Sequence, residues 1–89
     1  MITNQRKACA DEDPELFYPV SYSTPVGKAQ AENAKEVCSR CPFRDACREQ
    51  ALALEGNAEA ERRYGIWGAT TPAERRAIYD TRRKTALAA

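Results

Sequence analysis

The sequence predicts one small all-α domain, spanning residues 1–89 and containing four helical segments. Prolines and glycines separate stretches in which apolar residues recur at helical spacing, and one stretch opens with a complete capping box. No stretch shows the alternation of apolar and polar residues that marks a half-buried strand. A chain of this length has room for a single hydrophobic core.

The first two helical segments each begin with a capping residue followed by proline. Asp13 is predicted to cap a short turn that starts at Pro14 and stops before Pro19. Thr24, also followed by proline, is predicted to open a helix that reaches about Ser39. Apolar residues at helical spacing give this second segment one face for the core.

The last two helical segments are delimited in the same way. The third is predicted to begin at Pro42 and to end at Gly56, where a glycine suits the end of a helix. The fourth has the strongest start signal, because Thr71 and Glu74 form a capping box around Pro72 at the first helical position. This fourth helix leads into the C-terminus of the chain.

Apolar burial is a weak source of stability for this chain. Hydrophobic residues make up 43% of it, but 16 of them are alanine, and leucine, isoleucine, valine and phenylalanine together number only 12. Small chains with weak cores usually depend on disulfides, a metal or oligomerisation. The four cysteines are therefore the candidate source of additional stability.

The N-terminus indicates which cysteine chemistry to expect. It lacks the apolar segment of a signal peptide, and no stretch approaches the roughly 18 apolar residues that cross a membrane. The sequence therefore predicts a cytoplasmic protein without a membrane partner. Thiols stay reduced in the cytoplasm, where clustered cysteines more often bind metal than form disulfides.

The cysteines fall at Cys9, Cys38, Cys41 and Cys47, with the spacing C-x28-C-x2-C-x5-C. Cys38 and Cys41 lie where one predicted helix ends and the next begins, and Cys47 follows about a turn and a half later. Three thiols can therefore converge on one side of this corner, and Cys9 must join them from the N-terminal segment. The sequence predicts a metal-binding region over residues 9–47.

The spacing leaves three chemistries open. Structural zinc sites typically use two close cysteine pairs, whereas this chain has one pair and two separate cysteines. Irregular spacing with one remote ligand favours an iron–sulfur cluster, with a zinc-stabilised adaptor as an alternative. A thiol–disulfide oxidoreductase using Cys38 and Cys41 is the third, although no βαβ pattern surrounds this pair. Without histidine no Cys–His catalytic pair is possible, so we do not expect an enzyme.

The sequence also resembles the WhiB-like regulators of actinobacteria and their phages. The resemblance covers nearly the whole chain and rests on the four cysteines and on the runs DEDPELFYPV, VCSRCP, GIWG and ERR followed by a basic tail. It implies a small all-helical domain wrapped around a [4Fe-4S] cluster that is sensitive to oxygen and nitric oxide and is used in transcription regulation. The implied cluster ligands are Cys9, Cys38, Cys41 and Cys47.

Residues 64–69 are predicted to form a turn that carries Trp67. A tryptophan here could close the core or act as an exposed anchor for a partner. The resemblance implies that such aromatics contact the C-terminal domain (region 4) of the primary sigma factor. Alanine at 69 replaces a glycine of the family and accepts a positive φ less readily, so a slightly different turn is expected. The predicted sigma surface is Phe17, Tyr18, Pro19 and Trp67, and the turn also contains Gly65, Ile66 and Gly68.

Charge is divided unevenly along the chain. Residues 1–61 carry a net charge of −4 and residues 62–89 carry +5. The basic segment 72–89 is predicted to contact promoter DNA phosphates, with a solvated helix face as the alternative. The candidate contacts are Arg75, Arg76, Arg82, Arg83 and Lys84. The sequence thus predicts a transcription regulator that works with sigma factor and RNA polymerase.

Overall fold

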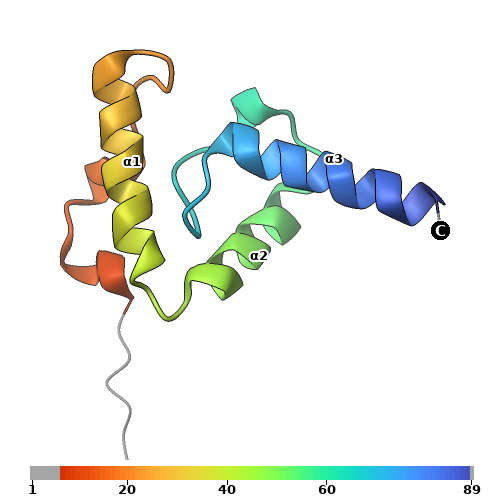
Figure 1. The fold of residues 1–89 in the computed structure, drawn as a ribbon, viewed down its shortest axis with the longest axis horizontal. Helices are drawn as coiled ribbons and strands as arrows, with labels where there is room; N and C mark the ends of the chain where they lie inside the picture. Colours follow the sequence, from red (N-terminus) through yellow and green to blue (C-terminus); the bar gives the residue numbers. More distant parts are fainter. Residues whose placement is uncertain (1–6, 89) are drawn as a thin grey trace, which may run out of the picture.

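A computed structural model describes residues 7–88, and residues 1–6 and 89 lie outside it, as does the side chain of residue 88. The described chain contains three α-helices, three 3₁₀ turns and no strand, which confirms the all-α prediction (Figure 1). The first of the four predicted helical segments is a 3₁₀ turn. The order is η1 (Ala8–Asp11), η2 (Pro14–Phe17), α1 (Pro25–Ser39), α2 (Arg44–Glu55), η3 (Ala60–Arg62) and α3 (Pro72–Ala88).

The predicted caps are present. A carboxylate oxygen of Asp13 accepts a hydrogen bond from the backbone N–H of Glu15 at 3.0 Å. The Thr24 hydroxyl accepts one from the backbone N–H of Gly27 at 3.1 Å. At the start of α3, the carboxylate of Glu74 accepts a hydrogen bond from the backbone N–H of Thr71 at 2.8 Å. The backbone N–H of Glu74 in turn donates to the Thr71 hydroxyl at 3.2 Å. These side chains satisfy backbone N–H groups that have no partner within the helix.

The start of α2 differs from the prediction. The helix begins at Arg44, two residues after Pro42, and ends before Gly56 as predicted. The intervening residues form a corner in which the N–H of Cys41 donates to the carbonyl of Cys38 at 3.0 Å. The backbone N–H of Phe43 donates to the Cys41 sulfur at 3.4 Å and makes no helical hydrogen bond.

The hydrophobic core is as small as the composition indicates. One face of α1 packs against η2 and against a residue of the loop that precedes α3. The loop is fastened to η2 by a hydrogen bond of 2.7 Å from the Ile66 N–H to the Phe17 carbonyl. The buried cluster consists of Phe17, Ala31, Ala34, Val37 and Ile66.

A buried ion cluster holds α2, η3 and α3 together. The carboxylate of Glu55 accepts Arg63 at 2.7 Å and Arg75 at 2.9 Å, and both guanidinium groups are fully buried. Arg63 also donates to the carbonyl of Gly56, and Arg75 to the carbonyl of Thr70. Every charge is paired or hydrogen-bonded, which is the condition under which burial of charge is tolerated.

Among the three α-helices, α1 alone contributes residues to the buried hydrophobic cluster. In Figure 1, α3 crosses the molecule and its C-terminal half extends beyond α2. Within the described residues, no helix is long and apolar enough to cross a membrane.

Candidate functional site

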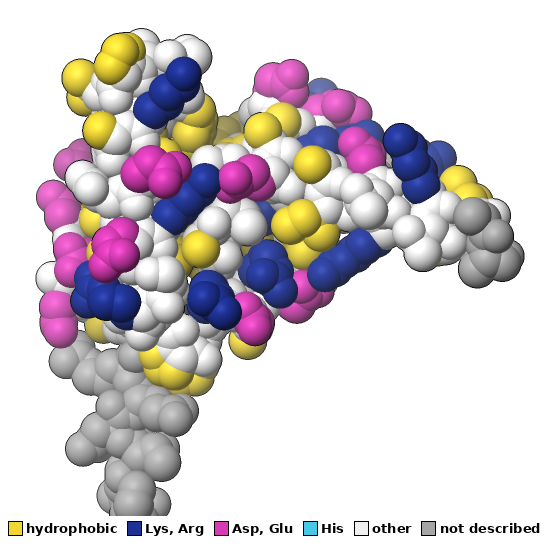
Figure 2. All heavy atoms as spheres, in the orientation of Figure 1, with side chains coloured by type: hydrophobic (Ala, Val, Ile, Leu, Met, Phe, Trp, Pro, Cys, Tyr) yellow, Lys and Arg dark blue, Asp and Glu magenta, His cyan; other side chains and the backbone are white. Residues whose placement is uncertain are grey.

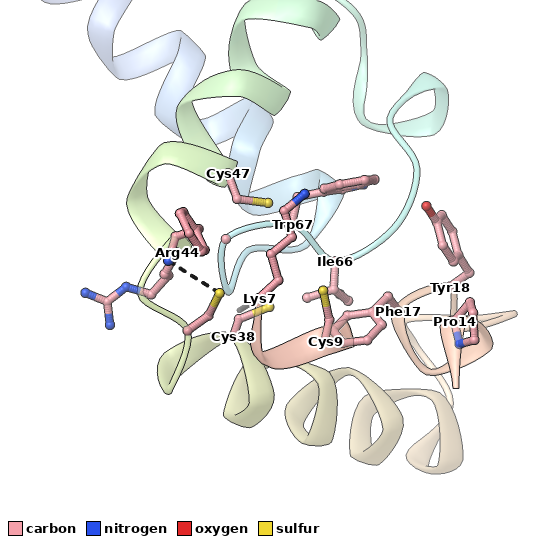
Figure 3. A pocket seen from close by; sticks show the side chains of 13 residues that line it. Lys7, Cys9, Pro14, Phe17, Tyr18, Cys38, Arg44, Cys47, Ile66 and Trp67 are labelled. Carbon is pink, nitrogen blue, oxygen red and sulfur yellow. Dashed lines mark hydrogen bonds between the residues drawn. The ribbon is translucent and has the colours of Figure 1, made fainter. Parts of the chain in front are cut away.

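The four cysteines line one cavity of about 280 Å³ (Figure 3). Cys9 lies on η1, Cys38 in the last turn of α1, Cys41 in the corner and Cys47 in α2. Cys9 is exposed and the other three are partly buried, and all four are free thiols. The sulfur-bearing side chains thus come from four successive parts of the chain to one place.

The four cysteines line the wall of a cavity and do not converge on one point. Among residues 7–88, no group of three or more histidine, cysteine, aspartate or glutamate side chains is arranged to hold a single metal ion. Most of the remaining lining is apolar, including Phe17, Phe43, Ile66 and Trp67. The cavity therefore offers sulfur ligands at its edge and an apolar wall between them.

Backbone N–H groups point at the sulfurs. Those of Ala8 and Phe43 each lie 3.4 Å from the Cys41 sulfur. Two N–H groups of the loop before α3 also affect the thiols: that of Gly68 acts to lower the pKa of Cys47, and that of Ala69 acts to lower the pKa of Cys38. Hydrogen bonds to sulfur stabilise a negatively charged thiolate.

Burial opposes ionisation of two of these thiols. It raises the pKa of Cys38, and the N–H of Ala69 offsets the rise only in part. Burial likewise raises the pKa of Cys47 against the N–H of Gly68. Reactive catalytic cysteines have a lowered pKa, because the thiolate is the nucleophile. Burial therefore opposes the activation that Cys38 would need as the nucleophile of a thiol–disulfide oxidoreductase.

The loop facing the cysteines is a tight turn. Trp67 and Thr70 exchange two backbone hydrogen bonds, of 3.1 and 3.0 Å. The two residues between them, Gly68 and Ala69, have φ values of 57° and 63°, which defines a type I′ turn. Ala69 adopts the left-handed conformation although alanine accepts a positive φ less readily than glycine. Among the described residues, no other non-glycine residue has a positive φ.

Glycine allows two aromatic rings to approach each other at one side of the cavity. A Cβ atom at Gly65 would lie 2.7 Å from the Tyr18 ring and 3.0 Å from the indole nitrogen of Trp67. The indole N–H donates to the carbonyl of Tyr64 at 2.9 Å, and the Trp67 side chain remains 40% exposed. Trp67 and Tyr18 therefore form an exposed aromatic rim of the cavity, and Tyr64 lies in a second pocket that also contains Tyr18.

Two of the residues assigned to the sigma surface are buried. Phe17 is 8% exposed and packs in the core, and Pro19 is also buried. Their positions do not fit direct contact with a partner, whereas those of Tyr18 and Trp67 do. Ile66 is likewise a core residue. The DEDPELFYPV run could not separate these roles, because η2 turns Phe17 inward and leaves Tyr18 outside.

The structure corrects one predicted DNA contact. Arg75 is fully buried in the ion cluster, so its guanidinium is not available to phosphate. Arg76 is partly buried and pairs with Asp80 and Glu59. These two residues contribute to the fold of α2, η3 and α3.

The other predicted DNA contacts lie on the outer half of α3. Both terminal nitrogens of Arg82 donate hydrogen bonds to the carboxylate of Glu49 on α2, at 2.8 and 2.9 Å. These hydrogen bonds lower the pKa of Glu49 to about 2. Figure 2 shows acidic and basic side chains interspersed over the face formed by α2 and α3. Arg83 and Lys84 are exposed on the last turns of α3.

Four residues that line the cavity were not predicted as site residues: Lys7, Pro14, Phe43 and Arg44. Phe43 lies between Cys41 and Cys47 in sequence, and that position was the available signal. Lys7 and Arg44 bring positive charge to the lining. Lys7, Phe43 and Arg44 each lie two or three residues from a cysteine, because the cavity is built largely from corners that are local in the chain.

Comparison with known proteins identifies the class of this small helical protein with four cysteines around one cavity. A family model described as "Transcription factor WhiB" matches residues 4–78. The transcriptional regulator WhiB1 of Bifidobacterium longum is 44% identical over 73 residues, covering 82% of this chain and 72% of that protein. WhiB1 of Mycobacterium tuberculosis is 41% identical over 78 residues, covering 88% and 84%. WhiD of Streptomyces coelicolor is 36% identical over 83 residues, covering 92% and 69%.

The chain therefore belongs to the WhiB family, and these relatives are named transcriptional regulators. The resemblance recognised in the sequence is confirmed at this level.

Proposed function

We propose that this protein is an iron–sulfur transcription regulator. Its cysteines hold a [4Fe-4S] cluster, its aromatic rim binds the C-terminal domain of the primary sigma factor, and the outer half of α3 contacts promoter DNA. The observation that carries the proposal is the single cavity at which four cysteines meet, with exposed aromatic side chains at its rim.

The residues of the cavity fit an iron–sulfur cluster. Such clusters take four thiolate ligands, and hydrogen bonds to sulfur help to set their reduction potentials. The chain supplies four cysteines around a space, N–H groups directed at the sulfurs and an apolar wall. Cys9, Cys38, Cys41 and Cys47 would hold the cluster, which when bound supplies electron transfer and reactivity toward oxygen and nitric oxide.

A single zinc ion fits the cavity less well. Zinc is held tetrahedrally by ligands that converge on one point. Residues 7–88 contain no such convergent group of three or more side chains. The distribution of the cysteines around a cavity supports the cluster in preference to a zinc-stabilised adaptor.

Protein purified without oxygen is expected to be brown and to contain about four irons and four sulfides per chain. Cys47→Ala is expected to lose or destabilise the cluster because the cavity then lacks one of its four ligands. Metal and sulfide analysis with visible absorbance measures both. Ser39→Ala is the control, since Ser39 lies next to Cys38 but donates only to the carbonyl of Glu36. One zinc and no sulfide per chain would contradict the proposal.

The aromatic rim is suited to a protein partner. Tyr18 and Trp67 are 49% and 40% exposed and line the cavity, and Tyr64, 70% exposed, lines a second pocket that shares Tyr18. Tyrosine and tryptophan are enriched among the residues that dominate protein interfaces. The indole of Trp67 is held in place by Tyr64, so little side-chain freedom is lost when a partner binds.

Trp67→Ala is expected to weaken binding to the sigma-factor domain by about 2 kcal/mol, roughly 30-fold, with the cluster absorbance unchanged. Calorimetric titration without oxygen measures the affinity. Leu54→Ala is the matched control, because Leu54 is 80% exposed on α2 and does not line the cavity. Unchanged affinity for the Trp67 variant would remove the indole from the interface.

DNA contact is proposed for Arg82, Arg83 and Lys84 rather than for the whole basic segment. Replacing all three by alanine is expected to flatten the salt dependence of promoter binding by the sigma complex by about one to three units, because each phosphate contact releases a counterion. Salt titrations of both complexes give the slopes. Arg40→Ala is the control for loss of a positive charge away from α3, since Arg40 is exposed just after α1 and pairs with Glu36. Equal slopes for the two complexes would show that these three residues make no phosphate contact and form only a solvated helix face.

A further inference from the structure

Lys7 places a positive charge in the lining of the cavity that the four cysteines share (Figure 3). It stands immediately before η1, two residues from Cys9, and it is exposed. Among the described residues, the only other charged residue of the lining is Arg44, and no aspartate or glutamate belongs to it. The charge of the lining is therefore entirely positive as long as the thiols are protonated.

The two positive side chains differ in whether a carboxylate already neutralises them. Arg44 donates from its Nε to the carboxylate of Asp45 at 3.1 Å. Within residues 7–88, Lys7 forms no ion pair. The acidic residues at 11, 12, 13 and 15 follow closely in the sequence, but none of them lines the cavity. Lys7 is therefore the uncompensated positive charge of the cavity.

A cation in this lining acts on the charge of whatever the cysteines bind. Four thiolates outweigh the positive charge of an iron–sulfide core, so a cluster bound here is an anion, and one added electron makes it more negative. A positive charge attracts the more negative state more strongly, in proportion to the charge and inversely with distance. Net charge is accordingly one of the factors that set the reduction potentials of such clusters.

We propose that Lys7 tunes the reduction potential at this site: its ammonium group stabilises the reduced, more negative state and so raises the potential. The inference rests on the proposed function for the presence of the cluster. The step concerned is the transfer of one electron from an external one-electron reductant. No bond to Lys7 forms or breaks and its proton stays in place, so the role depends on charge alone.

Substitutions that change the charge at residue 7 in steps test this role. Lys7→Met removes the charge and keeps an unbranched side chain, and it is expected to shift the potential to a more negative value. Lys7→Glu changes the charge by twice as much and is expected to give roughly twice that shift. Lys7→Arg keeps the charge and is expected to retain the potential of the unmodified chain.

The substitutions are expected to leave the fold unchanged. The side chain of Lys7 makes no capping hydrogen bond on η1. The hydrogen bond at this residue is made by its backbone carbonyl, which accepts the N–H of Ala10 at 3.0 Å and is present in every variant. Circular dichroism of each variant checks the fold.

Electrochemical titration of the cluster absorbance without oxygen measures the potential of each variant. Lys28→Met is the matched control, because Lys28 is exposed on the first turn of α1 and Cys38 lies on its last turn. The two residues are about 15 Å apart along the helix axis, beyond the screening length of about 10 Å at 0.1 M salt. The shift caused by Lys7→Met is also expected to shrink as salt is added, whereas a shift caused by altered packing would persist.

Each outcome decides between the alternatives. Potentials for Lys7→Met and Lys7→Glu that match that of Lys28→Met would overturn the proposal while leaving the proposed function intact. A shift for Lys7→Arg as large as that for Lys7→Met would also overturn it, because the shape of the side chain and not its charge would then be responsible. An unmodified chain that takes up no iron and sulfide would overturn the proposed function itself.

Discussion

Glu55→Gln is expected to lower the free energy of unfolding by about 3 kcal/mol or more, the cost of leaving buried charges without their partner. The glutamine keeps the size of the side chain but removes the charge shared by Arg63 and Arg75, whose guanidinium groups are fully buried. Backbone carbonyls still accept some of their N–H groups, but none of these acceptors is ionised. The loss is large for a protein of this size, because small domains are only marginally stable.

Denaturant unfolding of the protein prepared without oxygen measures this loss. Glu49→Gln is the matched control: it removes the same charge from the same helix, but Glu49 is exposed and its partner Arg82 can return to water. Exposed ion pairs contribute little, so the control is expected to unfold with an unchanged midpoint. Equal losses in the two variants would show that the buried cluster contributes no more than a surface ion pair.

The features predicted correctly from sequence depend on residues close together in the chain. The caps at Asp13, Thr24 and Thr71 each bind a backbone N–H two or three residues away. The ion cluster joins Glu55 to partners 8 and 20 residues later, and nothing local distinguishes Arg75 from the exposed Arg83. Arg75 was therefore assigned to DNA, since a basic run does not show which of its members faces inward.

In the candidate site, too, only the features that depend on residues close together in the chain could be predicted from the sequence. The spacing of Cys38, Cys41 and Cys47 implies convergence because two helices meet at a corner there. The positions of Phe17 and Tyr18 depend on how η2 packs on α1, which no pattern of two adjacent aromatics determines. Two of the N–H groups that act on the thiols, those of Gly68 and Ala69, come from a turn about 20 to 30 residues later in the chain, and backbone donors leave no signature in sequence.

Gly68→Ala is expected to lower the free energy of unfolding by about 3 kcal/mol and to accelerate loss of the cluster proposed above. A positive φ costs an alanine about 1–2 kcal/mol. The added methyl would also overlap Arg48 and the backbone of α2 at Arg44, and such overpacking typically costs about 1–3 kcal/mol more. Moving the turn away from α2 would relieve the overlap but would withdraw the N–H from Cys47.

Two neighbouring variants separate the causes. Gly56→Ala also places an alanine at a positive φ, of 57°, but Gly56 does not line the cavity and an added Cβ meets nothing within 4 Å, so this variant is expected to leave the proposed cluster unaffected. Ala69→Gly is expected to stabilise the protein by up to about 1 kcal/mol, because glycine relieves the strain at φ 63° and loses part of that gain in backbone entropy. Denaturant unfolding and cluster absorbance measure all three variants. If Gly68→Ala lost the cluster no faster than Gly56→Ala, contact between the turn and α2 would have no part in holding the site.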